Sequence, residues 1–190
     1  VEGDATALVA ALTRQLGPQR ITDVQEHGSF GTVTFQLDGI PLDLAMARQE
    51  TYPAPAENPV VRAGTLQADL ARRDFTINAM ALDLVAGELI DLHHGQEDLE
   101  SGQLRLLHGT SVQDDPTRVI RAARYAARLG FQLAEESREQ IRSTVAQWPW
   151  AWSQGDAALS APPALATRLR MELERLLERE PWPQALDLLE

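Results

Sequence analysis

Apolar residues recur at helical spacing between residues 7 and 12, after Asp4 and before Gly17. Because Asp favours the N-cap of a helix and Gly favours the position beyond its end, we expect a surface helix in this segment. Apolar and polar positions then alternate on both sides of Asp38-Gly39, a dipeptide typical of hairpin turns, and again around Ala86-Gly87. The pattern therefore predicts one helix and two antiparallel hairpins in the first part of the chain.

The stretch from Thr51 to Gly64 has no periodicity and is rich in proline and alanine. Because proline lacks a backbone N–H and fixes φ, Pro53, Pro55 and Pro59 argue against a regular element, and we expect a mobile loop. Apolar residues from Leu66 to Met80 then suggest helical turns.

The pattern changes beyond His108, where strand signals fade. Pro116–Leu129, Glu135–Val145 and Ala164–Leu177 all have the spacing of amphipathic helices. The chain is therefore predicted to be α+β, with a small, mostly antiparallel sheet and helices followed by an α-helical region. We place the domain boundary at this point, which gives residues 1–108 and residues 109–190.

Composition narrows the class of protein. With 190 residues and 44% hydrophobic residues, the chain is long enough for one sizeable core. Lys+Arg 17 against Asp+Glu 28 gives 17 − 28 = −11, so any RNA contact must be local. Without cysteine there is no disulfide and no cysteine zinc site. The chain shows neither a signal peptide nor a membrane span, so we expect a cytoplasmic protein with no membrane partner.

A row of arginines lies on the predicted helix that follows Pro116. At ~100° per residue, Arg118, Arg121, Arg124 and Arg128 fall within an arc of roughly 120°. Such a stripe suits a chain of phosphates or a nucleotide. The alternative is a solvated face on which the arginines pair with acidic neighbours.

Asp115 and Arg118 are neighbours at the start of this helix and offer a carboxylate acceptor beside a guanidinium donor. Cytosine and adenine both present an exocyclic amine next to an unprotonated ring nitrogen, whereas uracil and guanine present a carbonyl next to a ring N–H. We therefore hypothesise that the pair accepts C and A and rejects U and G, each mismatch costing ~1–3 kcal/mol. A protein template would then replace a nucleic acid template.

Other residues have both a functional and a structural interpretation. Arg72-Arg73-Asp74 could hold phosphate and a ribose hydroxyl, or could form a charged helix start. His93-His94 lacks a nearby cysteine or spaced carboxylate and is more typical of a solvated loop than of a metal site. Tryptophans could stack bases or anchor helices, and those concerned are Trp148, Trp150, Trp152 and Trp182.

Three motifs occur in a fixed order along the chain. They are Arg72-Arg73-Asp74-Phe75-Thr76-Ile77-Asn78-Ala79, then Asp91 with Gly95 and Asp98-Leu99, then Asp114-Asp115-Pro116-Thr117-Arg118 with Arg121 and Arg124. Their order and spacing resemble the class II tRNA nucleotidyltransferase and poly(A) polymerase family. The resemblance covers most of residues 1–131, and upstream it includes His27, Phe30-Gly31-Thr32, Leu42-Asp43-Leu44-Ala45, Arg48, Glu50 and Tyr52. Downstream, Arg168 and Glu172-Leu173 resemble the family's last head motif.

The resemblance implies a nucleotidyltransferase head of polymerase-β-like fold, followed by a helical neck that reads the base. It implies that CTP, ATP or both are donors, that the 3′ end of an RNA, expected to be tRNA, is the acceptor, and that Mg²⁺ assists. By the same resemblance, Arg73 and Asp74 would hold the ribose and phosphates, Asp115 and Arg118 would read the base, and Arg121 and Arg124 would continue the contact. Arg72 and Asn78 are also expected to bind the nucleotide.

Some positions depart from the family pattern. His94 stands where the family usually has glycine, within the segment 91–99 that would form the hinge between head and neck, and Asp114 replaces a more usual Glu. The family's metal-binding Asp-x-Asp pair would precede this chain, so its catalytic residues are unknown and no metal ligand is assigned. Asp43 is a candidate for a neighbouring catalytic carboxylate, and its alternative interpretation is an exposed strand-end acid. The family's C-terminal body and tail would follow the chain.

The expected function is template-independent addition of C, A or both to an RNA 3′ end. One alternative is a catalytically incomplete nucleotide- or RNA-binding relative without the metal carboxylates. Another is a helical interaction module whose arginines bind an acidic partner. CC-adding members of the family have a shortened loop ahead of the Arg-Arg-Asp motif, and because the segment 48–70 has full length, we favour an enzyme able to add A.

Overall fold

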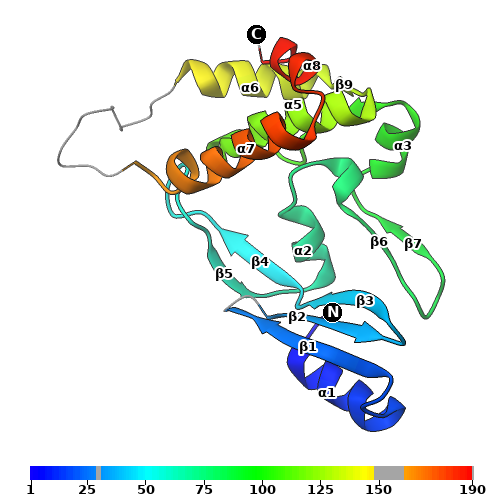
Figure 1. Ribbon diagram of the computed structural model, residues 1–190. Helices are drawn as coiled ribbons and strands as arrows, with labels where there is room; N and C mark the ends of the chain where they lie inside the picture. Colours follow the sequence, from blue (N-terminus) through cyan, green and yellow to red (C-terminus); the bar gives the residue numbers. More distant parts are fainter. Residues whose placement is uncertain (29–30, 148–160, 190) are drawn as a thin grey trace. The chain divides into compact units, whose positions relative to one another are not determined.

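The computed structural model describes residues 1–28, 31–147 and 161–189 (Figure 1). Its helices and small, mostly antiparallel sheets confirm the predicted α+β class. Within the described part of the chain, no helix has the length and apolar character that a membrane span requires. Internal contacts divide the chain into two compact units, Val1–Glu50 with Val61–Asp69, and Thr51–Val60 with Leu70–Glu190. The domain boundary predicted at residue 108 stays a prediction.

The first unit contains a three-stranded antiparallel sheet packed against α1 (Ala5–Leu16). The strands, in order, are β1 (Ile21–His27), β2 (Thr32–Leu37) and β3 (Ile40–Ala45). The Ala7 N–H donates to the Asp4 carboxylate at 3.1 Å, and β2 and β3 join at Asp38-Gly39. The predicted helix and hairpin are therefore confirmed, whereas the pattern had not indicated β1. Their core contains Val9, Ile21, Val33 and Phe35.

Two short strands bracket the proline-rich stretch. β4 (Arg48–Thr51) and β5 (Val60–Ala63) form a two-stranded sheet, so the prediction of a loop without regular structure is wrong at both ends. The middle of the stretch is also fixed within the second unit. Ala56 is 0% exposed, its N–H donates to the Gln113 carbonyl at 3.1 Å, and its own carbonyl accepts from the Ala164 N–H at 3.1 Å.

Short elements follow up to residue 91. α2 (Leu66–Ala71) and the 3₁₀ turn η2 (Thr76–Asn78) occupy the segment where helical turns were expected. β6 (Met80–Leu82) and β7 (Leu89–Asp91) pair antiparallel, which confirms the second hairpin. Phe75, immediately before η2, is 0% exposed and forms a β-bridge with Leu106, so this turn is fixed to the core of the second unit.

The remainder of the second unit is mostly helical. The predicted helices at 116–129 and 135–145 are confirmed, but a short parallel strand pair and a π-helical turn at residue 164 were not expected. The elements are α3 (Gly95–Glu100), β8 (Gln103–Leu104), α4 (Ser111–Asp114), α5 (Thr117–Leu129), β9 (Gln132–Leu133, parallel to β8), α6 (Glu135–Ala146), the π-helix η3 (Ala164–Arg168), α7 (Leu169–Arg179) and α8 (Trp182–Asp187).

α5 is the helix around which the second unit packs (Figure 1). Ala122 and Ala126 join a core that includes Phe75 and Leu104, while Ala123 packs with Leu176 of α7. Alanines on this helix allow neighbouring elements to approach closely, because a methyl group projects little from the backbone. The arginine-bearing side of α5 is thereby held against other elements of the unit.

Candidate nucleotide-binding site

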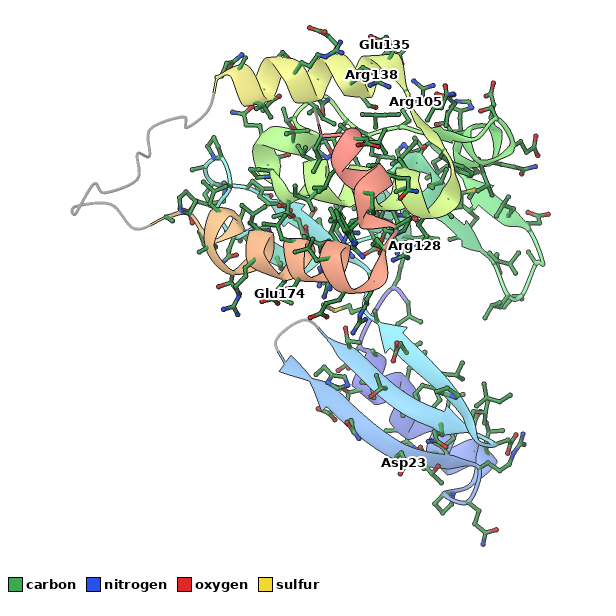
Figure 2. All side chains as sticks on the ribbon, turned by 45° about the horizontal axis from the view of Figure 1, so that its top comes forward. Asp23, Arg105, Arg128, Glu135, Arg138 and Glu174 are labelled. Atoms are coloured by element: carbon green, nitrogen blue, oxygen red, sulfur yellow. The ribbon has the colours of Figure 1, made fainter. Side chains whose placement is uncertain are left out.

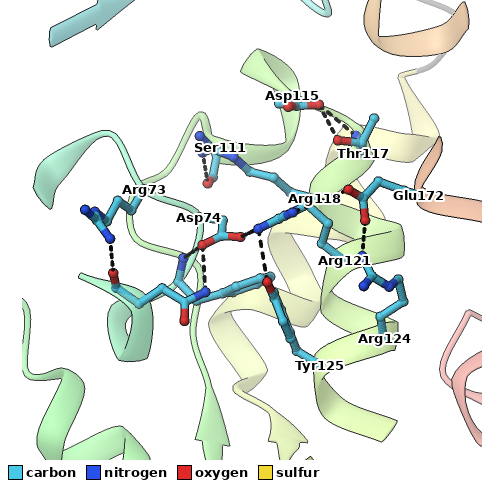
Figure 3. A network of polar contacts seen from close by, with 12 residues as sticks. Arg73, Asp74, Ser111, Asp115, Thr117, Arg118, Arg121, Arg124, Tyr125 and Glu172 are labelled. Carbon is cyan, nitrogen blue, oxygen red and sulfur yellow. Dashed lines mark hydrogen bonds and ion pairs between the residues drawn. The ribbon is translucent and has the colours of Figure 1, made fainter. Parts of the chain in front are cut away.

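Asp74 is the centre of the first group of predicted site residues (Figure 3). Its Oδ2 accepts from Arg121 Nε at 2.8 Å and Nη2 at 2.5 Å, and its Oδ1 accepts from Asn78 Nδ2 at 3.0 Å and the Phe75 N–H at 2.9 Å. Burial raises the pKa of Asp74, but the charge of Arg121 and these hydrogen bonds outweigh it, so the pKa lies below its ordinary value. The structure thus brings three predicted residues together around one ionised carboxylate.

The two preceding arginines are placed by their backbone and side-chain bonds. Arg73 Nη1 donates to the Asn78 carbonyl at 3.0 Å, which fixes this guanidinium beside η2. The Arg72 carbonyl accepts from Arg118 Nη2 at 3.0 Å. Since Arg118 belongs to α5, this bond ties the Arg-Arg-Asp segment to the helix that carries the other predicted residues.

Arg118 is 5% exposed and held on several sides. Its Nη1 donates to Ser111 Oγ at 2.5 Å and lies 3.3 Å from His108 Nε2. With the bond to the Arg72 carbonyl, three of the five guanidinium N–H groups have described partners. The orientation of Arg118 is therefore set by residues far apart in the sequence, and neither His108 nor Ser111 had been predicted.

Asp115 makes a separate set of contacts. Its Oδ1 accepts from the Thr117 N–H at 3.0 Å and from Thr117 Oγ1 at 2.7 Å, and its Oδ2 accepts from Arg168 Nη1 at 3.2 Å. Arg168 also donates to the carbonyls of Ala56 and Glu57. The side-chain bonds of Asp115 and Arg118 thus lead to different partners, although the Arg118 N–H donates to the Asp115 carbonyl at 3.0 Å.

The rest of the arginine stripe is covered by acidic residues of α7 and of the turn that follows it. Arg121 Nη1 donates to Glu172 at 3.4 Å, and Arg124 donates to Glu172 as well and to Glu180 at 2.9 Å. Arg128 also binds Glu180, at 2.8 Å through Nε. These contacts correspond to the alternative interpretation of arginines paired with acidic neighbours, except that Arg124 and both glutamates are buried rather than solvated.

An aromatic ring completes this network. The guanidinium carbons of Arg121, Arg124 and Arg128 lie 5.4, 5.9 and 5.5 Å from the centre of the Tyr125 ring. Cations at such distances are attracted to the face of an aromatic ring. Glu172 had been noticed in the sequence as part of a family motif, whereas Glu180 gave no signal because it lies more than 50 residues from its partners.

The segment expected to form a hinge has a defined turn. Asp91 accepts from the backbone N–H groups of His93, Gly95 and Gln96, and these bonds, against the opposing effect of burial, hold its pKa below the ordinary value. His94 has φ 59°, in the left-handed region that favours glycine. The residue that departs from the family pattern therefore stands at a position whose backbone suits glycine.

The described residues do not provide a metal site. In the parts of the chain that the structure describes, no group of three or more His, Cys, Asp or Glu side chains could hold a metal ion. Asp43 is exposed on β3, in agreement with its structural interpretation. The divalent ion that the family implies thus has no fitting ligand set here, and no chemical step is assigned to it.

The tryptophan hypotheses are tested at one position only. Trp148, Trp150 and Trp152 lie outside the described residues. Trp182 begins α8 and is 48% exposed, so it is only partly packed against the rest of the unit.

Comparison with known proteins identifies the family. A model of the poly A polymerase head domain matches residues 4–105, more than half of the chain. The A-adding tRNA nucleotidyltransferase of Aquifex aeolicus is 40% identical over 148 residues, which cover 76% of this chain and 18% of the relative. The CC-adding tRNA nucleotidyltransferase of Deinococcus radiodurans is 42% identical over 151 residues, which cover 75% of this chain and 40% of the relative.

Solved structures agree with this assignment. A CCA-adding enzyme in an apo form matches with a TM-score of 0.81 and 32% identity, over 98% of this chain and 41% of that one. A tRNA nucleotidyltransferase complexed with a primer tRNA and an incoming ATP analog matches with a TM-score of 0.75 and 33% identity, over 98% and 48%. The chain thus spans less than half the length of these relatives. Taken together, the three motifs, the fold and these matches show that the chain belongs to the class II tRNA nucleotidyltransferase and poly(A) polymerase family.

Proposed function

We propose that the chain is the head and neck part of a template-independent nucleotidyltransferase that adds C, A or both to the 3′ end of tRNA. Residues 1–108 would form the head and residues 109–190 the neck, in a cytoplasmic enzyme. CTP, ATP or both would be the donors. A divalent ion, expected to be Mg²⁺, belongs to this function by family membership, and the described residues provide no ligand set for it.

The geometric support for the proposal is the contact between the Arg-Arg-Asp segment and α5. Arg118 Nη2 donates to the Arg72 carbonyl at 3.0 Å, and Arg121 on the same helix pairs with Asp74. Residues proposed to hold the ribose and phosphates therefore lie beside a residue proposed to read the base. A single nucleotide could contact both groups, which is what the function requires.

To read the base, Asp115 must exchange one of its hydrogen-bond partners. Asp115 has a side chain that is 16% exposed and accepts from Arg168 at 3.2 Å. We propose that the exocyclic amine of cytosine or adenine replaces Arg168 as a donor to Asp115. Arg118 would then donate to the ring nitrogen through an N–H group other than the three with described partners.

The alternative of a helical interaction module has less support than the proposed enzyme. An interaction module that binds acidic partners would need accessible arginines, yet Arg124 is 5% exposed and pairs with Glu172 and Glu180.

Sequence similarity does not distinguish A addition from CC addition, since relatives of both kinds are about equally similar to this chain. We favour A addition because the segment 48–70, ahead of the Arg-Arg-Asp motif, has full length.

Titration calorimetry of this chain with CTP, ATP, UTP and GTP tests the proposal. Asp115→Ala and Arg118→Ala should remove selective binding of CTP and ATP. Asp187→Ala and Arg170→Ala are matched controls, because both residues are exposed and carry the same charges. Circular dichroism should confirm that each variant is folded.

Equal binding of all four nucleotides, or none, would exclude the protein template. Selective binding by a longer form of the protein that adds no nucleotide to RNA would instead favour the catalytically incomplete relative. Selective binding together with addition of C or A to a tRNA 3′ end would establish the proposed enzyme.

A further inference from the structure

His108 lies in a series of hydrogen bonds that ends at Arg118. Arg118 Nη1 is 3.3 Å from His108 Nε2, and His108 Nδ1 is 3.2 Å from Thr110 Oγ1. Thr110 Oγ1 in turn donates to Asp114 Oδ2 at 2.9 Å. Four side chains from the loop before α4, from α4 and from α5 are thus linked in one row.

The chemistry of the row decides where the imidazole proton resides. Arginine can only donate, so His108 Nε2 must accept and carries no hydrogen. The proton is therefore on Nδ1, from which it is donated to Thr110. Because the Thr110 hydroxyl donates onward to Asp114, each atom in the row has a partner of the opposite kind. Only a neutral imidazole of this tautomer satisfies all three contacts.

We infer that neutral His108 is a positioning residue that holds the Arg118 guanidinium in the orientation needed to read cytosine and adenine. The inference rests on the proposed base-reading role of Arg118. His108 and Ser111 both bind Nη1, while the Arg72 carbonyl binds Nη2, so the plane of the guanidinium is fixed from both ends. His108 itself would not touch the nucleotide.

The surroundings of the ring favour its neutral form. Among the described residues, the charged groups that face the imidazole are Arg118 of α5 and Asp114 of α4. The neutral side chain of Gln140, on α6, donates to the His108 carbonyl. Burial and the charge of Arg118 lower the pKa of His108, and Asp114 opposes them with a smaller effect. Protonation would place two donors and two positive charges against each other at 3.3 Å, and would release Arg118 from this contact.

Nuclear magnetic resonance of the full 190-residue chain tests the tautomer directly. With ¹⁵N-labelled histidine at pH 7.5, we expect His108 to show a protonated Nδ1 and an unprotonated Nε2. Substitution of Arg118 by Met should raise the pKa of His108, because the neighbouring positive charge is removed. A protonated Nε2 at pH 7.5, or an unchanged pKa in Arg118→Met, would overturn the inference whether or not nucleotides bind.

Calorimetry tests the consequence for selectivity. His108→Gln can still present an acceptor to Arg118 and should keep the preference for CTP and ATP over UTP and GTP, whereas His108→Ala should reduce it about tenfold. His27→Gln, an exposed histidine in the first unit, is the control. As the pH falls from 7.5 through and below the ordinary histidine pKa of 6.5, wild-type selectivity should decline while that of His108→Gln declines less, which separates His108 from titration of the nucleotides.

The two proposals can fail separately. Absence of selectivity in the wild type would refute the protein template and, with it, the role of His108 in that template. Selectivity in the wild type that is unchanged in His108→Ala, at a normal thermal midpoint, would refute the positioning role alone.

Discussion

Gly95 stands at the first position of α3, where the chain passes very close to η2. A Cβ added there would lie 2.3 Å from the Thr76 carbonyl oxygen and 3.0 Å from Met80 Cγ. Backbone atoms cannot yield as a flexible side chain does, so the close approach requires glycine at this position. Asp91, whose carboxylate accepts from the Gly95 N–H at 2.8 Å, holds the same turn from the other side.

Gly95→Ala should therefore lower the free energy of unfolding by about 2 kcal/mol, through overpacking against the Thr76 carbonyl. Gly109→Ala is the matched control, because a Cβ there would have no atom within 4 Å and no positive φ is involved. Urea denaturation followed by circular dichroism measures both. A loss in Gly95→Ala no larger than in the control would contradict this account of the turn.

At the scale of elements, α5 and α7 are joined by charged groups as well as by apolar packing. Glu172 and Glu180 lie on the α7 side, and Arg121, Arg124 and Arg128 on α5 bind them. Buried charges of this kind must be paired, since an unpaired one would lose its hydration without compensation. The pairs therefore fix which face of α5 meets α7, and through Arg121 they extend to Asp74.

Glu180→Gln should lower the free energy of unfolding by about 2 kcal/mol, because it removes the carboxylate that binds Arg128 and one of the two carboxylates that bind the buried Arg124. Glu174→Gln, on the helix that precedes Glu180, is the matched control; that side chain is 55% exposed, pairs with Arg170 and lies on the outer side of α7 (Figure 2). The control should change stability by no more than about 0.5 kcal/mol. Equal effects in thermal or urea denaturation would show that the Glu180 contacts are not structural.

The acid dependence of stability should depend on Asp74. Its folded-state pKa lies below the ordinary 3.8, so the carboxylate contributes stability that is complete above that value and is lost as the pH falls through and below it. Asp74→Asn should therefore be less stable than the wild type at pH 7 and should lose less stability between pH 5 and pH 2. Urea denaturation at each pH measures this, and parallel curves for the two proteins would contradict it.

At the scale of the whole molecule, binding and chemistry are proposed to depend on different parts of the protein. The residues proposed to bind nucleotide lie within the second unit, whereas the described residues provide no ligand set for a metal ion. The relatives are more than twice as long as the matched portion in each case cited. Nucleotide selectivity and nucleotidyl transfer should therefore be separable.

An RNA extension assay checks this separation. We expect residues 1–190 alone to add no labelled CMP or AMP to a tRNA lacking its 3′ end in the presence of Mg²⁺, and a longer form that includes the family's Asp-x-Asp strand to add it. Asp115→Ala in the longer form should then reduce the preference for C and A over U and G by at least tenfold. Transfer by residues 1–190 alone would show that the metal ligands lie within this chain.

The sequence by itself determined the elements whose signals are local. The α1 helix, the two hairpins and the α5 and α6 helices follow from periodicity and from turn residues such as Asp38-Gly39, because neighbours along the chain decide them. The family also followed from the sequence, since its three motifs are short and ordered. The strands β4 and β5 did not, because each is stabilised by pairing with the other across the intervening residues and not by a local pattern.

Only the tertiary structure decided which partners the functional side chains have. The arginine stripe could be read from its spacing, but its pairing with Glu172 and Glu180 depends on the packing of α7 against α5. The same holds for His108 and Ser111, which reach Arg118 through the course of the preceding loop. An arginine's charge is a local property of the sequence, whereas its burial, its partners and its orientation are set by elements that meet only in the folded chain.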